Sequence, residues 1–188
     1  MNTFTGPPAG RRDRGAEAVG VPRAGRTRSD DRLVELARVI AELAAARDSD
    51  SVVDTVVTRA AAVVGSSVAT VSLLVDDETF ALAAIRGGRA DTRARWSTYP
   101  VAAATPAGDA LRSGMPLALA GRDAILARYP DLAGQVPDER SLLCLPLQVA
   151  ERPLGVIGLV FPGVRTPDGQ ELEFLTVLAD TCAQALDR

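Results

Sequence analysis

The chain has 188 residues, of which 47% are apolar and 24% are charged, and its formal net charge is −3. This size allows one domain with a real core plus a tail. No apolar run approaches the roughly 18 to 20 residues that a membrane span needs, and no apolar segment follows the N-terminal arginines as it would in a secretory signal. Two distant cysteines, Cys144 and Cys182, have no metal-type spacing. We therefore expect a cytoplasmic protein with reduced thiols and no membrane partner.

The chain contains no histidine, and this absence excludes several kinds of site. Ser-His-Asp and Cys-His nucleophile arrangements need a histidine. So do HExxH and histidine-based zinc sites, and so does the usual proximal ligand of haem. Gly87 and Gly88 form a turn signal rather than a phosphate-binding loop. We therefore expect neither an enzyme nor a metal site in the isolated chain.

Residues 1–30 are rich in arginine, glycine and proline and carry almost no apolar side chains. Such a segment cannot bury enough surface to offset its ordering entropy, so we expect a disordered tail. Its six arginines stand against three acidic residues, which gives a charge of +3. A basic tail of this kind either contacts an acidic partner or is simply solvated. The second interpretation is favoured, and no nucleic-acid partner is expected.

The ordered pattern begins with two helices. Four apolar residues recur at spacings of three, four and three, namely Leu33, Leu36, Ile40 and Leu43. This periodicity predicts a helix over 33–47 with a heptad-like seam. Asp48 then offers an N-cap for a second helix over 50–64, which carries a broad valine-rich face and ends at Gly65.

A hairpin and an irregular segment follow. Residues 68–75 alternate and are β-branched, which predicts a strand, and 79–86 form the returning strand after an acidic turn. The stretch 89–104 shows no regular pattern and holds the only tryptophan, Trp96, together with Tyr99.

The second half of the domain starts with a short helix that opens at Thr105-Pro106 and ends at Gly114. A short strand over 115–119 and a short helix over 122–128 come next. The chain then reads as two strands, 142–147 and 154–161, and a final amphipathic helix over 170–187. These elements predict an α+β fold around a mainly antiparallel sheet of about five to six strands.

The last two strands are apolar on both faces, so both faces of the sheet must be covered. The three long helices can cover one face, which leaves residues 89–135 to cover the other. A cover made of loops and short helices often leaves a cavity beneath it. We therefore expect any ligand site on that side.

The C-terminal motif resembles that of GAF domains, which are small sensory modules. In that family an S-x-x-x-x-P-L strand, a glycine, an apolar G-x-x-G strand and an acidic helix start follow one another. The matching residues here are Ser141, Pro146, Leu147, Gly155, Gly158 and Asp168. The resemblance spans about 31–188 and implies a GAF-like, PAS-related fold, with the N- and C-terminal helices on one face of the sheet and short helices and loops over the other.

A second phrase is similar to GAF modules of bacterial multidomain regulators. It comprises Tyr99, Pro100, Thr105, Pro106, Ala110, Arg112, Gly114 and Pro116, and an A-R-Y-P-D-L phrase follows at 127–132. Such modules often precede a sporulation-type Ser/Thr phosphatase or a sensor kinase. The resemblance therefore implies signal transduction, with a possible effector domain beyond this chain.

The better-known ligand classes of the family do not match. The chain lacks the N-K-x-x-x-F-x-x-x-D-E signature of cyclic-nucleotide binders, and neither cysteine precedes a histidine as in bilin attachment. The haem class needs a histidine, and the free-methionine-sulfoxide-reductase class needs a set of pocket cysteines. The cofactor therefore stays unknown, with haem, bilin and cyclic nucleotide disfavoured.

Seven residues are candidates for lining a ligand pocket: Arg86, Trp96, Tyr99, Thr70, Ser72, Ser141 and Cys144. Trp96 and Tyr99 would stack on a planar ligand with Arg86 as a charged clamp. The alternative is that Trp96 plugs the sheet, that Cys144 is an inert buried thiol, and that the hydroxyls satisfy backbone groups.

The terminal helices are candidates for a homodimer interface. Besides the first seam, a second one repeats at Leu172, Leu175, Ala179, Cys182 and Leu186. These stripes either cover the sheet or, as the GAF resemblance implies, pair into a four-helix bundle. A disulfide between subunits at Cys182 is one option and a packed thiol is the other.

These observations predict a non-catalytic sensory domain that binds a small molecule and signals through its terminal helices. The alternative is a ligand-free scaffold of the same fold that only dimerises or docks an effector.

Overall fold

The structure is a computed structural model that describes residues 28–188, with side chains described from Val34 onward. Its centre is a sheet of six strands in the order β3-β2-β1-β6-β5-β4, and every neighbouring pair is antiparallel. The strands are β1 (Val68–Asp76), β2 (Thr79–Arg86), β3 (Thr98–Pro100), β4 (Leu117–Leu119), β5 (Arg140–Val149) and β6 (Arg152–Pro162). This arrangement confirms the predicted α+β, GAF-like fold.

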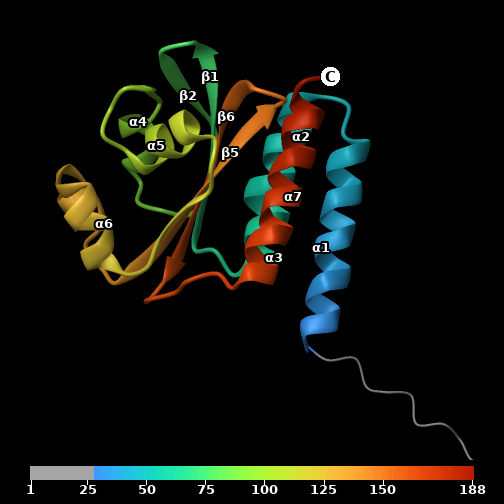
Figure 1. Cartoon of the computed structure of the whole chain (residues 1–188), viewed down its shortest axis with the longest axis horizontal. Helices are drawn as coiled ribbons and strands as arrows, with labels where there is room; N and C mark the ends of the chain where they lie inside the picture. Colours follow the sequence, from blue (N-terminus) through green and yellow to red (C-terminus); the bar gives the residue numbers. More distant parts are fainter. Residues whose placement is uncertain (1–27) are drawn as a thin grey trace, which may run out of the picture.

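The helices form two layers on opposite sides of the sheet (Figure 1). One layer contains α1 (Arg28–Ala45), α2 (Ser49–Thr55), a π-helical turn η1 (Val56–Ala60), α3 (Ala61–Val64) and α7 (Gly169–Leu186). The other contains α4 (Thr92–Arg95), α5 (Pro106–Ser113), α6 (Arg122–Arg128) and the 3-10 helix η2 (Pro130–Gln135). The tail expected over 1–30 lies outside the described residues, except that residues 28–30 begin α1.

Strand alternation divides the interior into two cores. On the long-helix side, Val71, Leu145 and Ile157 pack against helix residues such as Val52 and Leu178, and all five are at most 1% exposed. On the other side a smaller cluster gathers at Phe80, Val101, Ala110, Leu111, Cys144 and Val156. Because successive side chains of a strand point to opposite faces, both faces of the central strands are apolar.

The helix boundaries follow local capping chemistry. Asp48 and Asp168 accept hydrogen bonds from the backbone N–H of Ser51 and Glu171, both at 2.7 Å. The Thr105 hydroxyl likewise accepts from the Gly108 N–H at 3.1 Å. These contacts satisfy amide groups that a helix start leaves without partners, and they confirm the three predicted start points.

The segment 89–104 is more regular than its sequence indicates. It contains the one-turn helix α4 and the three-residue strand β3, which pairs with β2 through Phe80 and Tyr99. Elements this short have little intrinsic stability, and β3 forms here because the edge of β2 offers free backbone groups. Pro100 is tolerated because β3 is an edge strand.

The two helical seams face the core of the chain itself. Leu36, Leu43, Leu175, Ala179 and Cys182 are all at most 4% exposed within the long-helix core. Ile40, Leu172 and Leu186 are half-buried, and the Leu33 side chain lies outside the described part. The five buried residues are therefore covered by the chain itself and are corrected as dimer-interface residues. For the other four seam residues the dimer interface stays a prediction.

Within residues 28–188, no helix combines the length and the apolar character that crossing a membrane requires.

Candidate functional site

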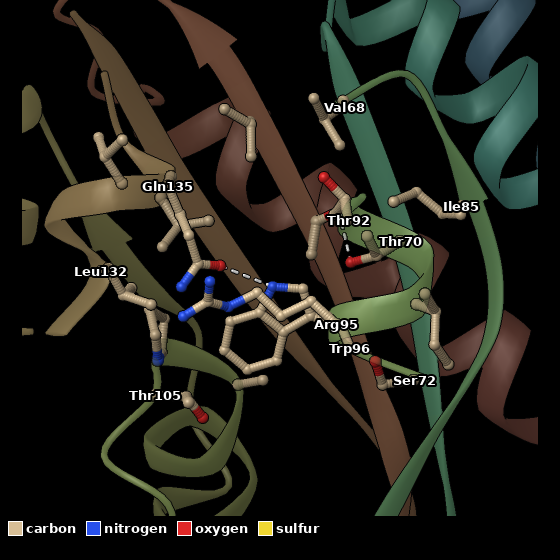
Figure 2. Close-up of a pocket in the computed structure, with 18 of the residues that line it drawn as sticks. Val68, Thr70, Ser72, Ile85, Thr92, Arg95, Trp96, Thr105, Leu132 and Gln135 are labelled. Carbon is tan, nitrogen blue, oxygen red and sulfur yellow. Dashed lines mark hydrogen bonds between the residues drawn. The ribbon is translucent and has the colours of Figure 1, made fainter. Parts of the chain in front are cut away.

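A cavity of about 500 Å³ lies between the sheet and the short-helix layer. Strands β1, β6 and β5 form its floor, and residues of α4, the start of α5 and η2 form its cover. Figure 2 shows these side chains converging from the two sides. A volume of this size is typical of small-molecule sites in proteins.

The floor consists of side chains in cross-strand rows. Thr70, Gly158 and Cys144 are direct neighbours across β1, β6 and β5, and so are Val68, Val160 and Leu142 in the next row. Gly158 presents no side chain on this floor, and the Thr70 hydroxyl occupies the position that a Cβ there would take. The Thr70 hydroxyl makes only a long contact of 3.4 Å to the Gly158 carbonyl, so it can turn toward a bound molecule.

Aromatic residues form one wall. The Trp96 and Tyr99 rings meet edge to face at 5.1 Å, and the Tyr99 hydroxyl donates a hydrogen bond of 2.9 Å to Ser72 Oγ. Burial raises the pKa of Tyr99 to about 12, although the Ser72 hydrogen bond acts in the opposite direction. Tyr99 is therefore a neutral donor at physiological pH and part of a fixed wall.

A hydrogen bond joins the two halves of the cover. Trp96 Nε1, at the end of α4, donates to Gln135 Oε1 at 2.7 Å, at the end of η2 (Figure 2). These residues are far apart in the sequence and belong to separate connections, so this contact ties the cover together over the cavity.

Replacing Gln135 with leucine should loosen this cover. A single hydrogen bond contributes about 0.5–1.5 kcal/mol, so amide exchange in residues 92–96 should rise by up to roughly tenfold. The emission of Trp96, the only tryptophan of the chain, should move to longer wavelength as the ring meets more water. Gln135→Glu, which keeps an oxygen acceptor, is the matched control; an equal effect of both variants would contradict the assignment.

The charged residues that line the cavity are mainly basic. They are Arg89, Arg95 and Arg140, against a single acidic residue, Asp91, whose carboxylate lies 3.5 Å from Arg89. Arg140 Nε is the one buried side-chain nitrogen or oxygen without a hydrogen-bond partner in the described part of the chain. The cavity therefore carries unbalanced positive charge.

Arg86 does not reach the cavity, which corrects its prediction as a clamp. The register of β1 with β2 shifts at Val71 and Ser72, so that Ala83 is an extra residue in β2. A bulge of this kind turns every following side chain to the opposite face. Arg86 therefore points to the long-helix side, where its Nη1 donates to the Thr58 carbonyl of η1 at 2.6 Å.

Ser141 is also outside the cavity, because it alternates with Arg140 and Leu142, which line it. Its hydroxyl is buried and donates to the Gly163 carbonyl at 2.8 Å. The same oxygen accepts from the N–H groups of Gly121 and Arg165. Ser141 thus fastens two loops, the one before α6 and the one between β6 and α7, as the alternative interpretation of the strand hydroxyls predicted.

The other predicted pocket residues do line the cavity: Thr70, Ser72, Trp96, Tyr99 and Cys144. Burial raises the pKa of the Cys144 thiol to about 12 and does the same to Cys182 in α7. A protonated buried thiol is a poor nucleophile at neutral pH. Cys182 is fully buried, so the disulfide between subunits is wrong and the packed thiol is confirmed.

Sequence reasoning missed Arg95, Gln135 and Arg140. Arg140 could have been found, since it precedes Leu142 and Cys144 by two and four residues and so shares their face of β5. Arg95 and Gln135 carry no comparable signal, because their positions depend on how a one-turn helix and a 3-10 helix fold over the sheet.

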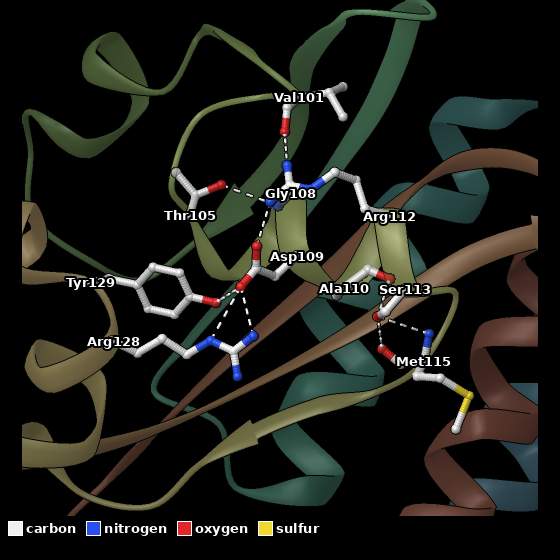
Figure 3. Close-up of polar contacts among 10 residues, drawn as sticks. All are labelled: Val101, Thr105, Gly108, Asp109, Ala110, Arg112, Ser113, Met115, Arg128 and Tyr129. Carbon is white, nitrogen blue, oxygen red and sulfur yellow. Dashed lines mark hydrogen bonds and ion pairs between the residues drawn. The ribbon is translucent and has the colours of Figure 1, made fainter.

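A second polar cluster holds the cover itself together (Figure 3). Asp109 of α5 accepts hydrogen bonds from the Tyr129 hydroxyl at 2.6 Å and from Arg128 Nη2 at 2.7 Å, both from the end of α6. Arg112 also binds Asp109 and the Val101 carbonyl. This cluster joins α5 to α6 beside the cavity and has no free nucleophile, so its role is structural.

Replacing Asp109 with alanine should destabilise the domain by about 1–3 kcal/mol, because it leaves the buried Tyr129 hydroxyl without its acceptor. Urea unfolding followed by circular dichroism would measure the loss. Asp123→Ala on α6 is the control, since within residues 28–188 that carboxylate has no hydrogen bond or ion pair. A loss no larger than in the control would contradict the role of the cluster.

The same cluster predicts a pH dependence. The Tyr129 hydrogen bond, followed by the contacts with Arg128 and Arg112, lowers the pKa of Asp109 below its ordinary value of 3.8, although desolvation opposes this. A carboxyl whose pKa is lower in the folded than in the unfolded state stabilises the fold fully at pH values above its unfolded-state pKa. This stabilisation is lost as the pH falls through its folded-state pKa. The stability difference between the wild type and Asp109→Ala should therefore shrink below about pH 4.

Comparisons with known proteins bear on this arrangement. The chain is similar to the GAF domain of a phosphoenolpyruvate-protein phosphotransferase from Coxiella burnetii, with 17% identity over 86% of this chain and 95% of that chain and a TM-score of 0.71. It is similar to the free methionine-R-sulfoxide reductase from Neisseria meningitidis, with 19% identity over 83% of this chain and 88% of that chain and a TM-score of 0.67. It is also similar to the GAF-B domain of DevS from Mycobacterium smegmatis, with 24% identity over 74% of this chain and 93% of that chain and a TM-score of 0.58. At these identities the likeness concerns the fold alone.

No curated protein matches the chain. The model of the GAF domain family matches residues 46–187, which is more than half of the sequence. That match covers the sheet, the cavity with its cover, and the last helix. The chain therefore belongs to the GAF domain family.

Proposed function

We propose that this GAF domain is a regulatory sensor that binds a small molecule reversibly in the cavity under α4, α5 and η2. The observation that carries the proposal is the cavity itself, which combines aliphatic walls with a few polar groups in a volume of about 500 Å³. Sites that bind small molecules typically have this composition. The thiol and phenol in the cavity have raised pKa values, which favours binding over covalent catalysis.

The sheet offers a physical route from the ligand to the terminal helices. Thr70 and Cys144 face the cavity, while Val71, Leu143 and Leu145, next to them in the chain, pack in the long-helix core. A ligand that shifts β1 or β5 would therefore change the surface on which α7 rests. Coupling of about 1–3 kcal/mol suffices for a regulatory switch, provided the helices have two discrete packings.

The effector is proposed to be a phosphatase or kinase domain in the same polypeptide of a bacterial signalling protein. Support comes from the resemblance of residues 99–116 to GAF modules of multidomain regulators. The proposal assigns no reductase activity to this chain, because a single cysteine, Cys144, lines the cavity and its thiol is protonated.

We also propose that the domain works as a homodimer. Apart from the buried seam residues, the apolar side chains that a partner could cover on the terminal helices include Val34 of α1 and Val177 of α7, which are 43% and 46% exposed. Light scattering should show a dimer that Val177→Glu weakens, while Val75→Glu, a change on β1 at a side chain that is 62% exposed, leaves it intact. A monomeric wild type would contradict this part of the proposal.

The alternative is a scaffold that dimerises or docks an effector without binding a ligand. One experiment distinguishes the two functions. Metabolite mixtures are screened for a change in Trp96 emission, and amide hydrogen exchange is then measured with each compound that gives a change. A sensor predicts that a hit changes exchange in α1 and α7 as well as in the cover. Exchange changes confined to the cover would contradict signalling through the helices.

A further inference from the structure

The geometry points to a small organic acid as the ligand: a molecule with an apolar, ring-sized body and a carboxylate group. We infer that Arg140 binds the carboxylate inside the cavity and that Arg95 contributes from the rim. This inference rests on the proposed function, since it names the ligand class for the same cavity.

The charge of the lining favours an anion. Three arginines and one aspartate line the cavity, and Asp91 lies 3.5 Å from Arg89. Two arginines are therefore left without an acidic residue of the lining. A cationic ligand would meet like charge here, whereas a carboxylate would be attracted.

Arg140 has a donor that nothing in the described chain satisfies. Its Nε is buried without an acceptor, and its Nη2 lies 3.2 Å from Asp138, a carboxylate that is 81% exposed while the Arg140 side chain is 24% exposed. A buried donor without an acceptor is costly, and a guanidinium prefers two parallel hydrogen bonds to one carboxylate. Because Nε is buried, the Arg140 side chain must turn toward the cavity on binding, and a ligand carboxylate then supplies the missing acceptor.

Arg95 belongs to the cover of the cavity, at the end of α4, and is exposed. In Figure 2 its side chain extends from α4 toward Gln135. Among the side chains of residues 34–188, none forms an ion pair with its guanidinium. The first residues of α5, Thr105 to Ala107, also line the cavity, and a helix start adds positive potential there.

The remaining lining indicates the body of the ligand. Nine aliphatic residues surround the space, namely Val68, Leu82, Ile85, Ile125, Leu132, Val136, Leu142, Val156 and Val160. Trp96 adds an aromatic wall next to Arg95. A very short acid would leave these walls in contact with water, whereas a ring-sized body covers them.

Three probes with one skeleton and different charge test this inference: 3-phenylpropanoate, 3-phenylpropanamide and 3-phenylpropylammonium. Binding is read from Trp96, the only tryptophan, so the signal comes from the cavity wall. We expect the acid to bind at least about tenfold more tightly than the amide, and the ammonium to bind most weakly.

Variants locate the effect. Arg140→Gln should weaken binding of the acid by about tenfold and leave binding of the amide unchanged. Arg140→Lys should give an intermediate loss, because lysine keeps the positive charge but lacks the two parallel N–H donors of the guanidinium. Arg95→Gln should give a smaller loss. Arg93→Gln is the matched control, since it removes a charge from the same short helix but does not line the cavity. Circular dichroism confirms that each variant is folded.

Other outcomes would overturn the inference. If the amide or the ammonium binds as tightly as the acid, or if Arg140→Gln keeps the preference for the acid, the ligand class is wrong while small-molecule binding stands. If none of the three probes changes Trp96 emission, the ligand class is overturned too. The proposed function is then judged separately, by native mass spectrometry of the wild type for a bound small molecule.

Discussion

Replacing Gly155 with valine should destabilise the domain by about 3 kcal/mol or more, enough to unfold much of a marginally stable chain. A Cβ on Gly155 would lie 2.2 Å from the Ser72 carbonyl oxygen and 3.0 Å from the Leu73 Cα. Both are backbone atoms of β1, so no side-chain rotation relieves the clash. The change would force apart β1 and β6, the two central strands of the sheet.

Urea unfolding followed by circular dichroism would measure this loss. Gly169→Ala at the start of α7 is the control, because no atom lies within 4 Å of the Cβ it would add and its backbone is helical. That variant should stay within about 0.5 kcal/mol of the wild type. A Gly155→Val protein as stable as this control would show that β1 and β6 are not packed as described.

The second large effect concerns the cavity. Thr70→Phe should weaken the binding of any small molecule that the cavity takes by at least about 100-fold, or roughly 3 kcal/mol. The ring would project from the floor over Gly158, into the space that a ligand needs. The fold should tolerate it, because Thr70 makes only a 3.4 Å hydrogen bond and phenylalanine favours strands.

Thr70→Val, which has nearly the same shape as threonine, is the control for the lost hydroxyl. It should keep ligand binding within about threefold if the floor acts mainly through its shape. Binding that survives in Thr70→Phe, with an unchanged unfolding midpoint, would mean that the ligand binds elsewhere on the domain.

Most of the fold could be predicted from the sequence, since local chemistry determined it. The start of α5 at Thr105-Pro106 and the capping of α7 by Asp168 depend on neighbouring residues alone. The doubly apolar strands β5 and β6 required cover on both faces, and the short-helix layer follows from that. By contrast, β3 forms because the edge of β2 offers a partner, which no local pattern reveals.

The site was predictable where strand alternation holds and unpredictable where it breaks. Thr70, Ser72 and Cys144 face the cavity as β-strand residues of one parity. In β2, the bulge at Ala83 reverses which side chains face the cavity, and Arg86 therefore points to the long-helix side of the sheet. Nothing in the sequence around Ala83 indicates a bulge, because it depends on how β2 pairs with β1.

The two glycines of the family motif lack a side chain for different physical reasons. Gly155 is needed because β1 backbone passes too close for a side chain, whereas a side chain at Gly158 would collide with the Thr70 hydroxyl on the cavity floor. A helical stripe is more ambiguous. The spacing of Leu172, Leu175 and Ala179 describes a face that must be covered, but it does not say whether the chain's own sheet or a second copy covers it.

The most direct test of a ligand-binding cavity is native mass spectrometry of freshly purified wild type and Thr70→Phe, each with a denatured control. We predict that the wild type carries an additional small mass that is lost on denaturation and is absent from Thr70→Phe. That mass would also identify the ligand. The same mass on both proteins, or no additional mass on either, would contradict the account.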